Sequence, residues 1–128
     1  MVKIWWIIII AIILVIAVAF LIGSEDSWIK DSRGVYVKHG NPGSIPIEVE
    51  EQQKLIESVL NLYEQKKTEG IQFNSQCLGS VGDYAVDIVN VPRSNVDNLI
   101  ENQCEDYRNG ALKYFIELDK NGEIVRIQ

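Results

Sequence analysis

The hydrophobic pattern divides the chain after Ile22. From Ile4 to Ile22, 19 consecutive residues are apolar. At about 1.5 Å per residue, a helix of this length can cross the roughly 30 Å hydrocarbon core of a bilayer. Two tryptophans near its start and a third beyond its end fit the aromatic belts found at membrane interfaces. We therefore predict a transmembrane anchor over residues 1–22, with residues 2–22 in contact with the lipid bilayer.

A cleaved signal peptide is the alternative interpretation of the same segment. Residues 17–19, Ala-Val-Ala, have the small-residue pattern of a cleavage site. However, residues 20–22 continue the apolar run past that site, and the run exceeds the roughly 7–15 residues that are usual for a signal peptide. The sequence favours an uncleaved anchor and leaves cleavage open.

The pattern after the anchor predicts a polar juxtamembrane linker over residues 23–34 and a small domain over residues 35–128. Residues 44–69 carry apolar side chains at helical spacing, with acids at the start and lysines at the end. They predict one main helix, capped by Ser44 or Ile45 and terminated at Gly70.

Shorter patterns predict the remaining elements of the domain. Alternating apolar and polar residues indicate strands, and clusters of Gly, Asn, Asp and Pro indicate turns. Ser94 followed by Asp97 resembles a helix capping box. In chain order we expect a β-prone run at 35–38, a turn at 39–43, an irregular segment at 71–83, a strand at 84–91, a second helix at 95–108 that contains Cys104, and a hairpin with strands in 112–118 and 124–127. The fold class is α+β, an N-terminal transmembrane helix followed by a domain with one main helix packed on an antiparallel sheet.

Charge separates the two parts of the chain as clearly as hydropathy does. The net charge is −6, and residues 23–128 contain all 18 acids but only 11 of the 12 bases. Nucleic-acid binding needs a basic surface, so an acidic domain argues against a nucleic-acid partner.

The two cysteines, Cys77 and Cys104, predict one disulfide if the domain is exported. Buried free thiols and cysteine chemistry with the single histidine, His39, are the alternatives. A metal site would need more ligands than these three residues supply, and we predict none.

Orientation follows from opposing signals. Lys30, Arg33 and Lys38 after the apolar run favour a cytoplasmic domain by the positive-inside rule. Glu25 and Asp26 are nearer to the membrane, and the cysteine pair favours an oxidising compartment. We predict a single-pass protein of the cell membrane with its C-terminal domain outside.

Catalytic motifs are missing from the sequence, so we predict no catalytic, cofactor-binding or metal-binding residue. Residues 119–123 lack the spacing of a calcium loop and predict a hairpin turn. Glu101 and Glu105 would share a helix face, most simply a solvated one. If the disulfide holds residues 101–108 against 79–83, the polar side chains of Asp83, Asn102 and Asp106 would form an internal network.

Several segments together resemble a family of short, uncharacterised, single-pass membrane-anchored proteins from archaeal genomes. They are DSRGVYVKHGNP, SQCLG, DYAVDIVNVPR, ENQCEDYRNG and FIELDKNGEIVRI. The resemblance spans about residues 28–127 and implies no activity. It implies only that Cys77 and Cys104 lie in recurring segments.

Three functional classes follow from the sequence. The first is an extracytoplasmic module with a structural or interaction role, binding a ligand or another envelope protein. The second is a filament subunit of the pilin type, although no Gly cleavage site precedes the apolar run. The third is an extracytoplasmic enzyme or inhibitor, which a pocket converging on His39, Asp83 or Glu101 would support.

Overall fold

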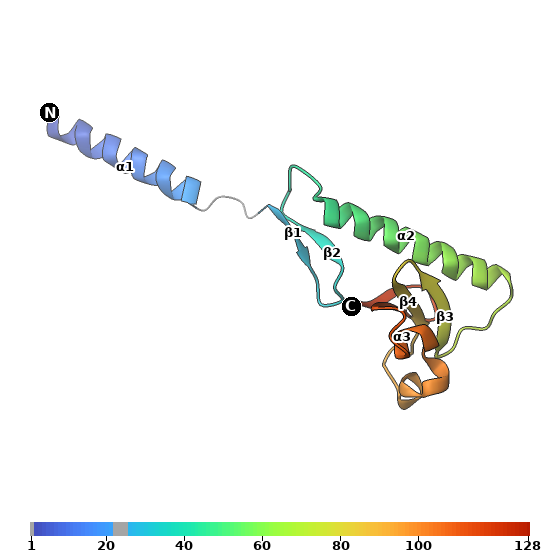
Figure 1. The fold of residues 1–128 in the computed structure, drawn as a ribbon. Coiled ribbons are helices and arrows are strands. Elements are labelled where there is room, and N and C mark those ends of the chain that lie inside the picture. Colours follow the sequence, from blue (N-terminus) through green and yellow to red (C-terminus); the bar gives the residue numbers. More distant parts are fainter. Residues whose placement is uncertain (1, 22–25) are drawn as a thin grey trace.

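The computed structural model describes residues 2–21 and 26–128 and shows an α+β protein (Figure 1). Within these residues, three α-helices and six strands make up the regular structure, and two short 3-10 helices span residues 95–98 and 100–102. The helices are α1 (Val2–Leu21), α2 (Ile47–Thr68) and α3 (Glu105–Arg108), and the strands are β1 (Ser27–Lys30), β2 (Tyr36–His39), β3 (Gln76–Val81), β4 (Tyr84–Ile88), β5 (Tyr114–Leu118) and β6 (Ile124–Ile127).

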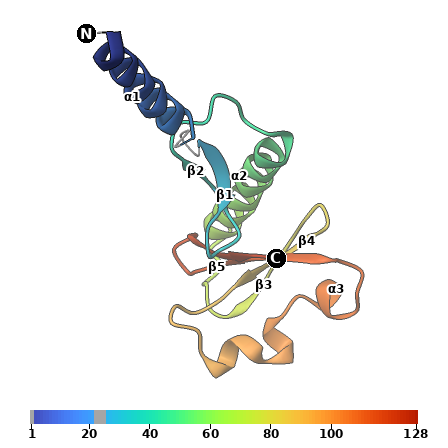
Figure 2. The same cartoon turned by 90° about the vertical axis from the view of Figure 1, so that its left-hand side faces the viewer.

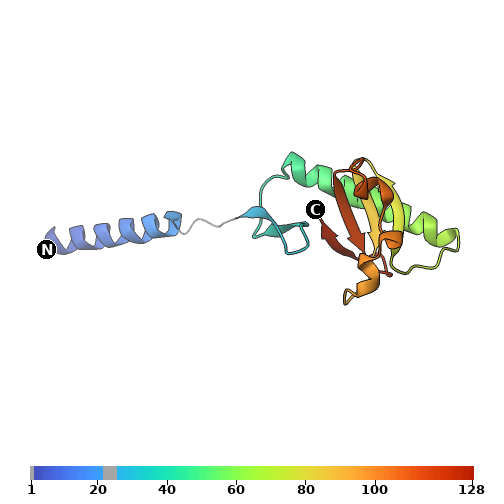
Figure 3. The same cartoon turned by 60° about the horizontal axis from the view of Figure 1, so that its bottom comes forward.

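The apolar helix α1 extends away from the α+β domain (Figures 1 and 3). Its large apolar side chains from Ile4 to Val18 are exposed, from 70% at Trp5 to 42% at Ile9. Over residues 2–21 and 26–128, no helix combines the length and the hydropathy needed to span a membrane. Residues 22–25, which include the end of the expected anchor and the start of the expected linker, lie outside the described residues.

The main sheet has the strand order β3-β4-β5-β6 and is mixed. The pairs β3–β4 and β5–β6 are antiparallel, whereas β4 and β5 are parallel. The expectation of an antiparallel sheet is therefore wrong for the central pair. Parallel neighbours need a long crossover, and residues 89–113 supply it between β4 and β5.

Helix α2 covers one face of this sheet and builds the main core (Figure 3). Val59 and Tyr63 of α2 are almost fully buried against apolar side chains of the central strands. Those side chains alternate along the strands, which is why every second residue of β4 and β5 faces α2. They are Val86, Ile88, Ile116 and Leu118.

The start of α2 differs from the prediction, whereas its end does not. Pro46 is the N-cap residue, and its carbonyl accepts hydrogen bonds from the backbone N–H groups of Val49 and Glu50. Neither Ser44 nor Ile45 caps the helix, because Pro46, with φ −60° and ψ 152°, is the last residue with an extended backbone before the first turn. Gly70, at φ +80°, terminates the helix as predicted.

Strands β1 and β2 form a separate two-stranded hairpin at the N-terminal end of the domain (Figure 1). The expected strand at 35–38 is confirmed as β2, while part of the expected linker 23–34 is strand β1. Gln52 of α2 fixes the hairpin. Its Oε1 accepts from the N–H of Tyr36 at 2.7 Å, and its Nε2 donates to the carbonyl of Gly34 at 2.9 Å.

Two further predictions about local structure are wrong. The segment 71–83 contains strand β3, whose alternation is interrupted by a bulge between Cys77 and Gly79. The expected helix 95–108 is two 3-10 helices followed by α3, because Leu99 and Gln103 have extended backbones that end each helical turn. The predicted capping box is nevertheless present. The hairpin β5–β6 is confirmed.

Candidate functional site

The disulfide between Cys77 and Cys104 is present and joins strand β3 to the residue before α3. Cys77 is exposed, whereas Cys104 is only 4% exposed. The bridge holds the crossover segment 89–113 against the sheet face opposite α2 (Figure 2). This covered second face is where the buried polar residues of the domain gather.

One cysteine, two acids and one arginine form a row across that second face. The strand register places Cys77 beside Asp87, Asp87 beside Glu117, and Glu117 beside Arg126. Because side chains alternate along strands, this row points away from α2. It therefore lies under the crossover segment instead of in the main core.

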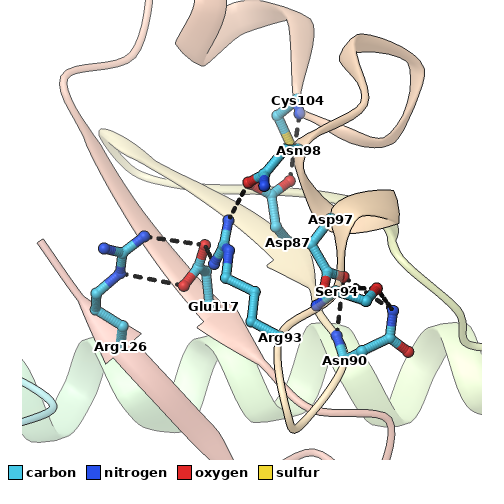
Figure 4. Close-up of polar contacts among 9 residues, drawn as sticks. All are labelled: Asp87, Asn90, Arg93, Ser94, Asp97, Asn98, Cys104, Glu117 and Arg126. Atoms are coloured by element: carbon cyan, nitrogen blue, oxygen red, sulfur yellow. Dashed lines mark hydrogen bonds and ion pairs between the residues drawn. The ribbon is translucent and has the colours of Figure 1, made fainter.

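Glu117 is 4% exposed and binds two arginines (Figure 4). Its Oε1 accepts from Nη1 of Arg93 at 2.7 Å, and its Oε2 accepts from Nε of Arg126 at 3.1 Å. The side chains of both arginines are more than 40% exposed, so water shares in solvating the two cations. The two arginines, which reach Glu117 from the protein's surface, thus neutralise the charge of this buried carboxylate.

Asp87 lies beside Glu117, but a backbone N–H group, and not an arginine, donates to its carboxylate (Figure 4). Its Oδ1 accepts one hydrogen bond, from the backbone N–H of Cys104 at 3.2 Å. Burial raises the pKa of Asp87 from 3.8 to about 6, and the negative charge of Glu117 acts in the same direction. The Cys104 N–H and Arg93 act in the opposite direction on this pKa without cancelling the rise.

Asp97 ties the loop after β4 to the first 3-10 helix (Figure 4). Its carboxylate accepts from the backbone N–H groups of Asn90, at 2.9 Å, and Ser94, at 2.7 Å. Burial by itself raises the pKa of Asp97, but these backbone hydrogen bonds, together with side-chain hydrogen bonds such as that from the Ser94 hydroxyl, outweigh burial and hold the pKa below its ordinary value.

A cavity of about 150 Å³ lies above these charges. Ligand pockets usually measure about 300–1,000 Å³, so this volume suits water or a very small group. Asp87, Asp97 and Glu117 each hold hydrogen bonds within the protein. We therefore assign this cluster, the second-face network, a structural role in fixing the crossover segment. Its lining residues include Arg93, Arg126, Tyr107 and Phe115.

The sulfur atoms and Asp87 also form a cluster that could ligate a metal, with ligand atoms within 4.8 Å of one another. Thiolates are the metal-binding form of cysteine, and the disulfide between Cys77 and Cys104 removes both. The oxidised protein therefore does not use these residues as a metal site.

A larger groove, of about 410 Å³, lies on the other side of the domain, where the hairpin, α2, the β3–β4 turn and β5 meet. We call it the tyrosine groove. Its lining combines three tyrosines, three acids, one lysine and the apolar side chains of Leu55 and Val81. The tyrosines are Tyr36, Tyr84 and Tyr114, and the charged residues are Glu48, Glu51, Asp83 and Lys30.

Aromatic contacts organise the tyrosine groove. Tyr84 and Tyr114 are paired across β4 and β5, and their rings stack with centroids 5.0 Å apart. At the hairpin side, the ammonium nitrogen of Lys30 lies 4.9 Å from the ring centroid of Tyr36. Burial raises the pKa of the Tyr84 hydroxyl, with smaller contributions from Tyr114 and Asp83. Tyr84 therefore stays neutral at physiological pH, and the three tyrosines offer aromatic faces and hydroxyls to the groove.

The structure does not join the three residues expected to form an internal network. Asp83 is exposed and lines the tyrosine groove. Asn102 donates from Nδ2 to the carbonyl of Val96 at 2.9 Å, and Asp106 is exposed on α3. Within residues 26–128, the hydrogen bonds found do not link these side chains. The polar side chains that the crossover segment covers are instead Asp97 and Glu117, which are buried, and Asp87, which is half-buried.

Other candidates from the sequence lie apart from both cavities. His39 is exposed at the end of β2, and Glu101 is exposed in the second 3-10 helix. Neither lines the second-face cavity or the tyrosine groove. Residues 119–123 form the predicted hairpin turn, in which the Asp119 carboxylate accepts from the N–H groups of Asn121 and Glu123.

Comparison with known proteins gives no match, so a proposal of function depends on this geometry. The chain matches no protein-family model, no curated protein and no solved structure. The resemblance to archaeal membrane-anchored proteins accordingly stays a prediction from the sequence.

Proposed function

We propose that the protein is a membrane-anchored binding module whose disulfide-bonded domain lies outside the cytoplasm and presents the tyrosine groove to a ligand. The observation that carries the proposal is the combination, in one short chain, of an apolar run from Ile4 to Ile22 and a domain closed by the Cys77–Cys104 bridge. Disulfides persist mainly in oxidising compartments outside the cytoplasm.

The anchoring part of the proposal relies on the sequence. The described residues contain no helix that qualifies as a span, and the apolar run continues into Ile22, beyond them. Support from the structure is the exposure of α1, whose isoleucines, such as Ile7 at 66% and Ile13 at 60%, face solvent on all sides. Exposed apolar surface of this kind is stable only against lipid or another apolar surface.

The binding part of the proposal relies on the contrast between the two cavities. The second-face cavity is small, at about 150 Å³, and the carboxylates of the second-face network are engaged by arginines and backbone N–H groups. The tyrosine groove has the volume of a ligand site and exposes polar and aromatic groups together. A groove without a partnered nucleophile and base favours binding over catalysis.

Alkaline carbonate extraction of cell membranes tests the anchor. We expect the full chain to stay in the membrane pellet, and the Ile9→Lys/Ile13→Lys variant to be released. A matched control is Ile45→Lys/Ile47→Lys, which alters two exposed isoleucines outside α1 and should leave the protein in the pellet. Release of the wild-type chain by carbonate would contradict the anchor.

Labelling of intact cells with a membrane-impermeant amine reagent tests the orientation. Lys54 and Lys120 are exposed and should be labelled if the domain lies outside. Labelling that appears only after lysis would place the domain in the cytoplasm. N-terminal sequencing of the same sample separates an uncleaved anchor from the alternatives of a cleaved signal peptide and a processed pilin-type subunit.

A further inference from the structure

We propose that the tyrosine groove binds an alkylammonium group, at the position where the Lys30 ammonium now lies. This inference deepens the proposed function by naming the ligand class of the groove. It depends on that proposal only for the role of the groove, and the position of α1 does not enter the argument.

The aromatic lining is the first reason for a cationic ligand. Cations bind the faces of aromatic rings within about 6 Å of the centroid, and cages of several rings bind quaternary and alkylated ammonium groups. The groove holds three tyrosines, contributed by β2, β4 and β5. Tyr114 keeps 44% of its surface exposed, so part of the stacked pair remains open to a ligand.

The charge of the lining is the second reason. Three carboxylates, those of Glu48, Glu51 and Asp83, face one ammonium group, that of Lys30. In the part of the chain that the structure describes, none of these three carboxylates forms an ion pair. An excess of negative charge in the lining of a groove attracts cations and repels anions.

Lys30 shows where such a group sits. Its ammonium lies 4.9 Å from the Tyr36 ring centroid and forms no ion pair with the acids of the described residues. Lys30 is the last residue of β1 and is exposed, so its long side chain can leave the groove without disturbing the strand. Lys30 thus acts as an internal competitor, which a ligand ammonium displaces.

The size of the groove limits the ligand to a small group. About 410 Å³ accommodates an organic cation or the end of a lysine side chain. Both sources share the alkylammonium chemistry, and carboxylate and hydroxyl oxygens of the lining can accept from the N–H groups of a primary ammonium.

The first experiment measures binding to the full chain by isothermal titration calorimetry, in a detergent without an ammonium group. Choline is compared with 3,3-dimethylbutan-1-ol, its neutral isostere, and N-acetyl-lysine methylamide with the norleucine analogue. We expect at least one cation to bind ten-fold or more tightly than its neutral partner. Discrimination only within the lysine pair identifies a side chain of a protein partner, and discrimination by choline identifies a small amine. Equal affinities within both pairs would overturn the proposal.

Two variants locate the site, and we expect them to change the affinity for the cation in opposite directions. Tyr114→Leu keeps apolar volume but removes an aromatic face, so the cation should bind about ten-fold more weakly. Lys30→Met removes the internal competitor and should tighten binding about three- to ten-fold. Unchanged or weaker binding by Lys30→Met would overturn the assignment of the site.

The matched control for the lysine variant is Lys67→Met. The ammonium of Lys67 also lies over a tyrosine ring, 5.7 Å from the centroid of Tyr63, but outside the groove. The Lys67→Met variant should leave the affinity for the cation unchanged. Should Tyr114→Leu not fold, Glu51→Gln, at an exposed position of the lining, should weaken binding in the same direction. If no cation binds but the protein resists carbonate extraction from the membrane, the inference about the ligand is rejected while the proposed membrane anchor stands.

Discussion

Asp87 and Glu117 lie directly opposite each other on the parallel strands β4 and β5, but their carboxylates have different hydrogen-bond partners. Glu117 is bound by Arg93 and Arg126, whereas Asp87 accepts one backbone hydrogen bond. Two adjacent carboxylates under a covering segment cannot both ionise without cost, so the one with fewer partners takes up the proton more readily. The pair therefore makes the stability of the domain depend on pH.

The Asp87→Asn variant should be more stable than the wild type at pH 7.5 but not at pH 4. The pKa of Asp87 is about 6 in the folded protein and 3.8 ordinarily, so the folded state holds the extra proton between these values. The contribution of Asp87 to stability falls as the pH rises from about 4 to 6 and then levels off, by at most about 3 kcal/mol. Urea denaturation at the two pH values measures the difference. A difference that does not change with pH would contradict this account.

Asp97→Asn is the matched comparison and should behave in the opposite way. The pKa of Asp97 lies below its ordinary value of 3.8. At a pH above 3.8 the ionised carboxylate stabilises the fold, and this stabilisation is lost as the pH falls through the lowered pKa. An asparagine presents one acceptor oxygen to N–H groups that now bind two. We expect a loss of about 1–2 kcal/mol at pH 7.5.

Breaking the disulfide should lower the free energy of unfolding by about 3–4 kcal/mol, the chain-entropy value for a bridge across 27 positions. The bridge also holds the Cys104 N–H against Asp87, so reduction should loosen the crossover segment first. Urea denaturation with and without a reductant measures the loss. The Cys77→Ala/Cys104→Ala variant serves as the control, because the reductant should not affect it. An unchanged wild-type midpoint under reductant would refute a stabilising role.

Gly122→Ala should destabilise the domain more than Gly110→Ala. Both glycines have positive φ, +85° and +81°, so the backbone strain is similar. A Cβ at Gly122 would lie 2.9 Å from Cε1 of Tyr63, whereas a Cβ at Gly110 has nothing within 4 Å. Tyr63 cannot easily move, because its ring stacks on Phe73 and its hydroxyl donates to the carbonyl of Lys120 at 3.0 Å.

We expect about 1 kcal/mol for Gly110→Ala and at least about 1 kcal/mol more for Gly122→Ala. Thermal denaturation of the two variants gives the comparison directly. Equal losses would mean that the turn moves away from α2 without cost.

Elements with local signals were predictable from the sequence. Helix α2 has apolar spacing, charged ends and Gly70, and hairpin β5–β6 has alternation and a turn between its strands. Strand β3 was not predictable, because the bulge at Gly79 interrupts its alternation and Leu78 is its one buried apolar side chain. The relative direction of β4 and β5 depends on the path of a crossover that has no local signal.

The sites depend on residues far apart in the chain, which explains why the sequence pointed elsewhere. Glu117 has partners 24 and 9 residues away, and the tyrosine groove draws on five separate segments. One signal was present. Phe115 alternates with the residues that face α2, and an apolar side chain there indicates that the second face of the sheet is also covered.

The central claim, an anchored domain with its disulfide outside the cytoplasm, is tested most directly by alkylation of membranes from intact cells, followed by intact mass. The sample is denatured and alkylated before and after reduction. We predict no adduct before reduction, two adducts after it, on Cys77 and Cys104, and a mass that retains residues 1–22. Two adducts without reduction, or a mass that begins after the apolar run, would contradict the account.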